Sequence, residues 1–343
     1  MPRHDQLAGL DPRCYAPYAN PRDYILSWTD EIWVTRALGR LGEHYAKNIK
    51  VHTAYGETYG FDTVIQNSVQ KMSAFPNGGG GSGEDVIWEQ RGPAGFISSH
   101  RVLKTGTHTG HWTYGPPTGR DWVSRTIAHC LVRDGKVVEE WLVRDEFAVL
   151  QSLGLEPEQI ATELAASSPV TASNIDIQSA AAFAGHFPAP TSLGISGRRP
   201  DRYQAECDLV QSMFEKVWNQ RRFDLVPTFC NSTVVCHSVR LRRFQGIDGY
   251  QQAIIDLLAV FPDASVEVRD VVVNESEDLG LRIAVIWVLN GTYSGVPLYG
   301  KPTRKPVKVL GASHYEMLNG KILREWRIYD EIAVFAQIIR ARG

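Results

Sequence analysis

The spacing of hydrophobic and polar positions changes along this chain from helical to strand-like. Apolar residues recur at helical spacing in three segments, which are 23–38, 203–220 and 248–261. Segments rich in β-branched and aromatic residues follow the last of these and predict strands over 266–275, 281–293, 305–318 and 321–335. Helices followed by a curved, mostly antiparallel sheet predict an α+β architecture with helices on one side of the sheet.

The sequence overlays itself after a shift of 185 residues. The stretch HCLVRDGKVVEEWLVRDEFA from His129 matches HYEMLNGKILREWRIYDEIA from His314, and GTHTG at 106–110 matches GTYSG at 291–295. Trp33 and Trp218 fall in the same register further upstream. The chain is therefore predicted to hold two copies of one domain.

The repeat sets the expected domain boundaries. The copies span 22–158 and 202–343, after an N-terminal arm over 1–21. The segment 159–201 is rich in Ala, Ser, Thr and Pro and is predicted to be a linker, whose first part has the pattern of a helix. We expect the two copies to form an internal pseudo-dimer through the outer faces of their sheets. The repeat does not decide whether the chain also forms a larger homo-oligomer.

The charge balance argues against nucleic acid or a membrane as the main partner. The chain has 36 basic and 38 acidic residues and no basic run, so a hydrophobic small molecule is the expected ligand. Five cysteines without a C-x-x-C pair favour reduced thiols and predict neither a disulfide framework nor a structural zinc site. The N-terminal residues lack the apolar stretch of a signal peptide, which predicts a cytoplasmic protein.

Two consecutive motifs carry a family resemblance. The first copy reads GTHTGHWTYGPPTGR and then DGKVVEEWLVRDEFAVLQSLG, which resembles the SnoaL-like polyketide cyclases of the nuclear transport factor 2-like superfamily; the second copy matches less closely. The resemblance implies a cone-shaped α+β barrel around an apolar cavity, and acid/base chemistry by a carboxylate without a cofactor. It maps the strand-end Asp of the family onto Asp145, and onto Asp330 in the second copy.

The last strand of the first copy predicts which side chains meet this cavity. Alternation places Glu139, Trp141 and Asp145 on one mainly apolar face, and Glu140 with Arg144 on the other. We assign the Trp141 face to the cavity and expect burial there to raise the pKa of Asp145. The alternative is an Asp that caps a turn or pairs with an Arg.

Several histidines and aromatic residues are further candidates for the site. With a three-residue hairpin loop, His129 lies opposite Glu139 and roughly 20 Å from Asp145 along the strand, so the two are not expected to touch. His129 and its counterpart His314 then line the far end of a cavity or belong to the core. His108 is favoured over His111 as the residue on the cavity side. Residues three apart on a strand face opposite ways, which argues against a metal ion shared by the two. The other candidates are His52, His237, Trp112, Trp141, Tyr293 and Trp326.

The predicted function is cofactor-independent acid/base catalysis on an aromatic or polyketide-like molecule, mainly in the first copy. Cyclisation, dehydration, isomerisation and C–C cleavage all need the same kind of acid/base group in an apolar cavity. Epoxide or ester hydrolysis, and a non-catalytic role in ligand binding or protein association, remain open at this point.

Overall fold

The computed structural model of this protein describes residues 6–77, 81–167 and 203–342. It contains two six-stranded sheets, with the strand orders β2-β1-β6-β5-β4-β3 and β8-β7-β12-β11-β10-β9. The first sheet comprises β1 (Tyr45–Thr53), β2 (Gly56–Tyr59), β3 (Gly81–Gln90), β4 (Gly95–Thr107), β5 (Asp121–Arg133) and β6 (Lys136–Arg144). The second comprises β7 (Cys230–His237), β8 (Arg243–Gln245), β9 (Ser265–Ser276), β10 (Gly280–Thr292), β11 (Pro306–Leu318) and β12 (Lys321–Tyr329). In each sheet one pair is parallel, β1 with β6 and β7 with β12, and the other pairs are antiparallel, so the predicted α+β fold is confirmed.

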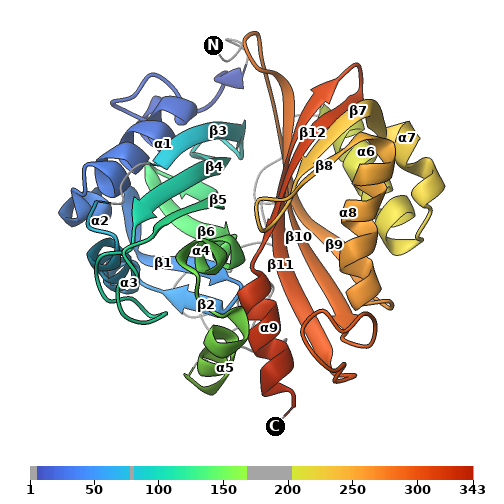
Figure 1. The fold of residues 1–343 in the computed structure, drawn as a ribbon. Coiled ribbons are helices and arrows are strands. Elements are labelled where there is room, and N and C mark those ends of the chain that lie inside the picture. The colour runs from blue at the N-terminus through green and yellow to red at the C-terminus, as the bar shows by residue number, and fades with distance from the viewer. Residues whose placement is uncertain (1–5, 78–80, 168–202, 343) are drawn as a thin grey trace.

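Helices cover one face of each sheet, and the two sheets face each other through their opposite faces, which are the outer faces of the two domains (Figure 1). The first domain contributes α1 (Pro21–Thr29), α2 (Leu41–His44) and α3 (Phe61–Ala74), and the second α6 (Gln204–Met213), α7 (Val226–Phe229) and α8 (Gly246–Val260). Three further helices gather at one end, namely α4 (Glu146–Leu153), α5 (Pro157–Ser167) and α9 (Glu331–Arg340). None of the helices within the described residues has the length and apolar composition needed to cross a membrane.

The predicted strand over 321–335 is wrong in its last part. Strand β12 ends at Tyr329, and Asp330 starts α9 by accepting hydrogen bonds from the backbone N–H groups of Ile332 and Ala333 at 2.9 and 3.1 Å. An Asp at this position satisfies N–H groups that the first helical turn leaves free. The sequence pattern hid the change, because α9 is buried from Glu331 to Ile338 and its apolar run resembles that of a strand.

The hairpin between β5 and β6 also differs from the expectation. Asp134 and Gly135 both have positive φ angles, of 48° and 74°, which gives a two-residue turn that pairs Arg133 with Lys136. A bulge beyond Leu131 then shifts the register, so that His129 lies opposite Trp141 and not opposite Glu139. His129 therefore shares a face with Trp141 in spite of the shorter turn.

The arm and the linker are only partly described. Gln6 of the arm donates hydrogen bonds to the Tyr203 hydroxyl at 3.2 Å and to the Glu275 carbonyl at 2.6 Å, both in the second domain. Cys14 and Tyr15 are buried in the core of the first domain, so the arm contacts both domains. The beginning of the predicted linker forms the end of α5, and the rest of it, from 168, lies outside the described residues.

The sheets pack on each other through their outer faces, as the repeat predicted. The shared apolar cluster takes Ile127, Leu131, Trp141 and Val143 from the first sheet and Ile286, Val288, Leu310, Ala312 and Ile328 from the second. All of these side chains are buried. The outer faces are therefore core, which explains why they are as apolar as an interior face.

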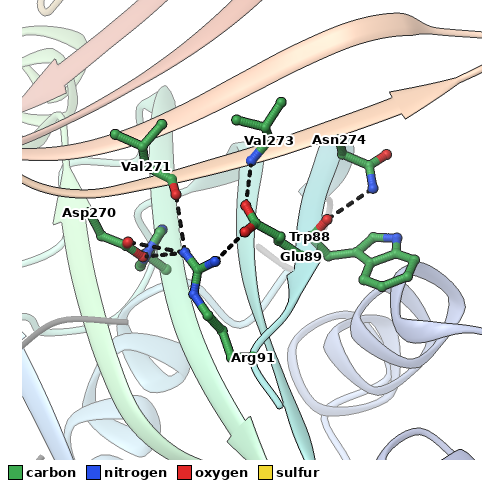
Figure 2. A network of polar contacts seen from close by, with 8 residues as sticks. Trp88, Glu89, Arg91, Asp270, Val271, Val273 and Asn274 are labelled. Atoms are coloured by element: carbon green, nitrogen blue, oxygen red, sulfur yellow. Dashed lines mark hydrogen bonds and ion pairs between the residues drawn. The ribbon is translucent and has the colours of Figure 1, made fainter. Parts of the chain in front are cut away.

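A buried polar network links the two domains (Figure 2). Arg91 is 2% exposed and forms an ion pair with Glu89 of its own domain and with Asp270 of the other, at 3.1 Å in the latter case. Its guanidinium also donates to the Val271 carbonyl at 3.1 Å, while Glu89 accepts from the Val273 N–H at 3.0 Å. Each buried charge in this network thus has a partner, which burial in a low dielectric requires.

Replacing Arg91 tests how strongly the two domains depend on this network. Arg91→Ala removes the cation that Glu89 and Asp270 share and leaves Asp270 with His129 alone, so the free energy of unfolding is expected to fall by roughly 3–5 kcal/mol. Urea denaturation followed by tryptophan fluorescence measures the change. The control is Arg222→Ala, which removes an exposed pair with Asp224 and is expected to cause no measurable shift. Equal midpoints for the two variants would contradict the account.

Candidate functional site

The packing of the sheets decides which side chains of the first domain face its helices. Ser99 and Arg101 of β4 point toward the second domain, where the Ser99 hydroxyl lies 2.8 Å from His314 Nε2 and Arg101 stacks over Trp326. Because side chains alternate along a strand, the residues between and beyond them face the helices. The side chains that face α1 and α3 from β4, β5 and β6 are here called the first interior; they include His100, Val102, Lys104, Thr126, Ala128, Glu140, Leu142 and Arg144.

The assignment of the Trp141 face to the cavity is therefore wrong. Trp141 is 1% exposed and lies between the two sheets, while Glu140 and Arg144 belong to the first interior. The tandem packing buries both faces of β6, so the apolar character of a face does not tell which one meets the helices. Trp326 occupies the corresponding interface position in the second domain, under Arg101.

Glu140 is the buried carboxyl group of the first interior. It is 5% exposed, and within the described residues its side chain accepts one hydrogen bond, from the Tyr45 hydroxyl at 3.0 Å. Burial raises the pKa of Glu140, while the Tyr45 hydrogen bond and the cations Arg144 and Lys104 act in the opposite direction. A carboxyl group whose pKa is raised by burial is better suited to general acid/base catalysis than an exposed one.

Two cations, Lys104 and Arg144, act on the charge of this carboxyl group. Lys104 and Arg144 are half-buried and form no ion pair in the part of the chain that the structure describes, and the Arg144 Nε is buried without a hydrogen-bond partner. Lys71 of α3 pairs with Glu146 at 3.6 Å and lies over the rings of Trp112 and Trp122. The first interior thus has cationic groups that no protein carboxylate neutralises directly.

Aromatic side chains form a wall next to these cations. The ring of Phe75 lies 4.8 Å from that of Trp112 and 5.0 Å from that of Trp122, and Trp112 lies 4.3 Å from Tyr114. Trp112 is half-buried, so one edge of this wall reaches solvent. The predicted aromatic role of Trp112 fits this position.

His108 supports the wall from a fully buried position. Its ring lies 5.3 Å from that of Phe75, its Nδ1 accepts a hydrogen bond from the Thr118 N–H at 3.3 Å, and its Nε2 has no partner. The side chain is 0% exposed, so a ligand does not reach it without a rearrangement of the wall.

The second domain fills the corresponding space with its own side chains. Trp287 occupies the position of Val102 and is paired across the strands with Gly311, where an added Cβ would lie 2.1 Å from the Trp287 ring. Glu325, the counterpart of Glu140, is 0% exposed and pairs with Arg327 at 2.6 Å. The second interior is therefore closed and its carboxylate is neutralised.

The cations of the first interior have apolar or uncharged counterparts in the second. Lys104 corresponds to Leu289, and Arg144 to Tyr329. A comparison of the two copies could have shown these two differences, which lie in the same interior as Glu140. Our sequence analysis did not use them. It missed Lys71 and Trp122 as well.

Asp145 and Asp330 begin helices at the junction of the domains. Asp145 is 1% exposed and accepts a hydrogen bond from the Ala148 N–H at 3.2 Å through Oδ1, while Oδ2 has no partner. Burial raises the pKa of Asp145 to about 7, and Glu331 of the second domain adds to the rise. Burial and then the negative charge of Glu146 raise the pKa of Asp330 to about 8. The raised pKa was expected for Asp145, but its cause is the domain junction and not a cavity face.

The other histidine candidates lie between or beside the sheets. His129 Nε2 is 3.0 Å from Asp270 Oδ2 across the interface, and His314 contacts Ser99 as described above. His52 stacks on Trp141 with its Nε2 at 2.7 Å from Glu139, and His237 stacks on Trp326. None of these four contacts the first interior residues named here, so the structure does not bring them to one site with Glu140.

The last predicted site residue, Tyr293, belongs to a packed loop of the second domain. Tyr293 is 0% exposed and donates a hydrogen bond to the Gly300 carbonyl at 2.5 Å, which makes it part of a packed loop. Among the described residues, no group of three or more His, Cys, Asp or Glu side chains is arranged to hold a metal ion.

The fold of each domain and its repeat agree with a known family. The model of the SnoaL-like polyketide cyclases matches residues 24–153 and again 208–338, which together make up more than half of the chain. The chain belongs to the SnoaL-like polyketide cyclase family. This tandem SnoaL-like protein therefore carries two copies of the family domain. Among curated proteins, no sequence matches it at a significant level.

Solved structures similar to this SnoaL-like protein each cover one copy. A SnoaL-like polyketide cyclase from Agrobacterium tumefaciens is 23% identical, with a TM-score of 0.31, and the match covers 38% of this chain and 95% of that one. A protein from Acidithiobacillus ferrooxidans that is provisionally named a polyketide cyclase is 19% identical, with a TM-score of 0.35, over 40% of this chain and 96% of that one. An LEH-like epoxide hydrolase of M. tuberculosis is 14% identical, with a TM-score of 0.31, over 40% and 88%.

The first interior can be closed by copying the second. The double variant Val102→Trp with Thr126→Gly reproduces the Trp287–Gly311 pair at equivalent paired positions of β4 and β5. We expect it to remain folded and to bind an anionic aromatic probe such as anilinonaphthalene sulfonate at least about tenfold more weakly, because the ring fills the space. The control is Val296→Ala, at an exposed loop position of the second domain. Unchanged probe affinity in the double variant, measured by fluorescence titration, would contradict this assignment.

The junction carboxyls make stability depend on pH. Folded Asp330 keeps its proton up to about pH 8, whereas its ordinary pKa is 3.8, so the folded state binds more protons between these values and stability falls as pH rises through this window. Asn is equally good at starting a helix and carries no charge. Asp330→Asn is therefore expected to unfold at a higher temperature than wild type at pH 9 and at a similar temperature at pH 5. If the melting temperatures of wild type and Asp330→Asn change in parallel from pH 5 to pH 9, Asp330 is not the source of the pH dependence. The exposed control Asp224→Asn is expected to change in parallel with wild type.

Proposed function

We propose that this protein is an acid/base enzyme that acts on an aromatic or polyketide-like carbonyl compound inside its first domain. The observation that carries the proposal is the contrast between the two interiors. Within the described residues Glu140 of the first forms no ion pair, whereas Glu325 of the second pairs with Arg327. Ionisable groups without partners are costly in a protein interior, and they cluster at functional sites.

The charges and rings of the first interior indicate the substrate class. Arg144 and Lys104 favour a ligand with a carboxylate, a phenolate or an oxygen on which negative charge develops. Trp112 offers an aromatic face at the edge of the wall, which suits a flat, hydrophobic molecule. An aromatic or polyketide-like compound with carbonyl oxygens meets both requirements.

The same groups define one chemical step. The Glu140 carboxylate removes a proton from the carbon next to a carbonyl group; the electron pair of that C–H bond forms a C=C bond, and the π pair of the carbonyl group moves to its oxygen. Arg144 stabilises the resulting enolate oxygen by its charge. When the enolate carbon attacks a second carbonyl of the same molecule, Glu140 returns the proton to the new alkoxide, which completes an aldol-type cyclisation.

Glu140 and Asp145 can be separated by matched substitutions. Glu140→Gln keeps the shape of the side chain and removes the acid/base group, so kcat is expected to fall by about 10²–10⁴-fold. Asp145→Asn keeps the start of α4 and is expected to retain kcat within about threefold, because Asp145 faces the second domain. The assay follows β-keto esters and β-hydroxy ketones by absorbance and mass spectrometry.

The reverse pattern would overturn the role of Glu140. Loss of turnover in Asp145→Asn with full activity in Glu140→Gln would make Asp145 the acid/base group, as the family resemblance maps it. If wild type binds aromatic carbonyl compounds tightly but converts none of the panel, a ligand-binding role replaces the enzymatic one.

A further inference from the structure

Lys104 is a lysine whose amine has no hydrogen-bonding or charged partner among the described residues. It lies on β4 between Leu103 and Thr105, is half-buried, and forms neither a hydrogen bond nor an ion pair in the described part of the chain. Its Nζ lies 5.6 Å from the centre of the Trp33 ring. By contrast, the neighbouring Lys71 is paired with Glu146. Lys104 is therefore the amine of the first interior that is free to meet a ligand.

The surroundings favour the neutral, nucleophilic form of this amine. Burial, followed by the positive charges of Lys71 and Arg144, lowers the pKa of Lys104 to about 7, against the weaker opposing effect of Glu140 and Glu146. A lysine that is desolvated beside other cations is the usual form of an amine nucleophile. The repeat places Leu289 at this position in the second copy, so the amine belongs to the first copy alone.

We propose that Lys104 is a catalytic residue that forms an imine with the carbonyl carbon of the substrate in the first interior. The proposal deepens the proposed function and rests on it, because it assumes a carbonyl substrate. Glu140, whose charge acts on Lys104, serves as the proton donor and acceptor for the step.

The imine forms without any further reactant. The lone pair of Lys104 Nζ bonds to the carbonyl carbon, and the carbonyl oxygen takes a proton to give a carbinolamine. Protonation of its hydroxyl by Glu140 then releases one water as the C–O bond breaks, and the nitrogen lone pair forms the C=N bond. The protonated imine draws electrons from the adjacent carbon, so Glu140 removes the neighbouring proton more easily than from the free carbonyl compound. Addition of water reverses the sequence and frees the amine.

Reductive trapping tests this assignment in the full chain. The probe is 4-formylbenzoate, an anionic aromatic aldehyde, with sodium cyanoborohydride at pH 7, and digestion followed by mass spectrometry locates the reduced adduct. We expect Lys104 to be labelled at least about tenfold faster than the exposed Lys47 and Lys301, because a far larger fraction of its amine is unprotonated at this pH.

Two variants give matched controls for the labelling. Lys104→Arg keeps the positive charge and removes the nucleophile, so the fast adduct is expected to disappear while labelling of Lys47 and Lys301 is unchanged. Val102→Trp with Thr126→Gly keeps Lys104 but fills the space beside it, and is expected to slow its labelling to the rate of a surface lysine.

The outcomes separate this proposal from the proposed function. Labelling of Lys104 no faster than that of Lys47 and Lys301 in the wild-type chain would overturn the imine. Turnover of a carbonyl substrate with kcat retained within threefold in Lys104→Arg would also overturn it and would leave the acid/base enzyme standing. Fast, saturable labelling of Lys104 without turnover of any carbonyl compound would support the imine-forming site while the proposed cyclisation chemistry fails.

Discussion

The burial of two sheet faces against each other is the constraint on which the rest of this structure depends. Every charge on those faces must be paired, and Arg91 achieves this by binding Glu89 and Asp270 together (Figure 2). The same packing sends Ser99 and Arg101 toward the second domain. It thereby turns the alternate residues of β4, β5 and β6 toward the helices, and Glu140 and Lys104 are among them.

The two copies of the family domain differ in how their interiors are packed and how their charges are paired. In the second copy Trp287 fills the interior opposite Gly311, and Arg327 neutralises Glu325, so packing and pairing make it a stable partner for the first. In the first copy Lys104 and Arg144 are half-buried and form no ion pair among the residues that the structure describes.

The repeat, the α+β fold and the pairing of the copies could be predicted from the sequence, because register between two long segments and strand alternation are local signals. The face of β6 that meets the helices could not be predicted, because both faces of β6 are buried in the tandem arrangement and Trp141 is as apolar as any cavity residue. The bulge near Leu131 and the helix begun by Asp330 also escaped, because each depends on tertiary pairing. Glu140 was placed correctly on the face opposite Trp141, but the cavity was assigned to the Trp141 face.

The central claim is that one site, inside the first domain, binds the substrate. The most direct measurement is a crystal structure of the full chain with an anionic aromatic carbonyl compound bound, such as 4-formylbenzoate. The account predicts one molecule per chain, in the first interior, with its carbonyl group at Lys104 and Glu140 and its ring near Trp33 or Trp112. A molecule bound in the second interior, or at the domain junction beside Asp145, would contradict it.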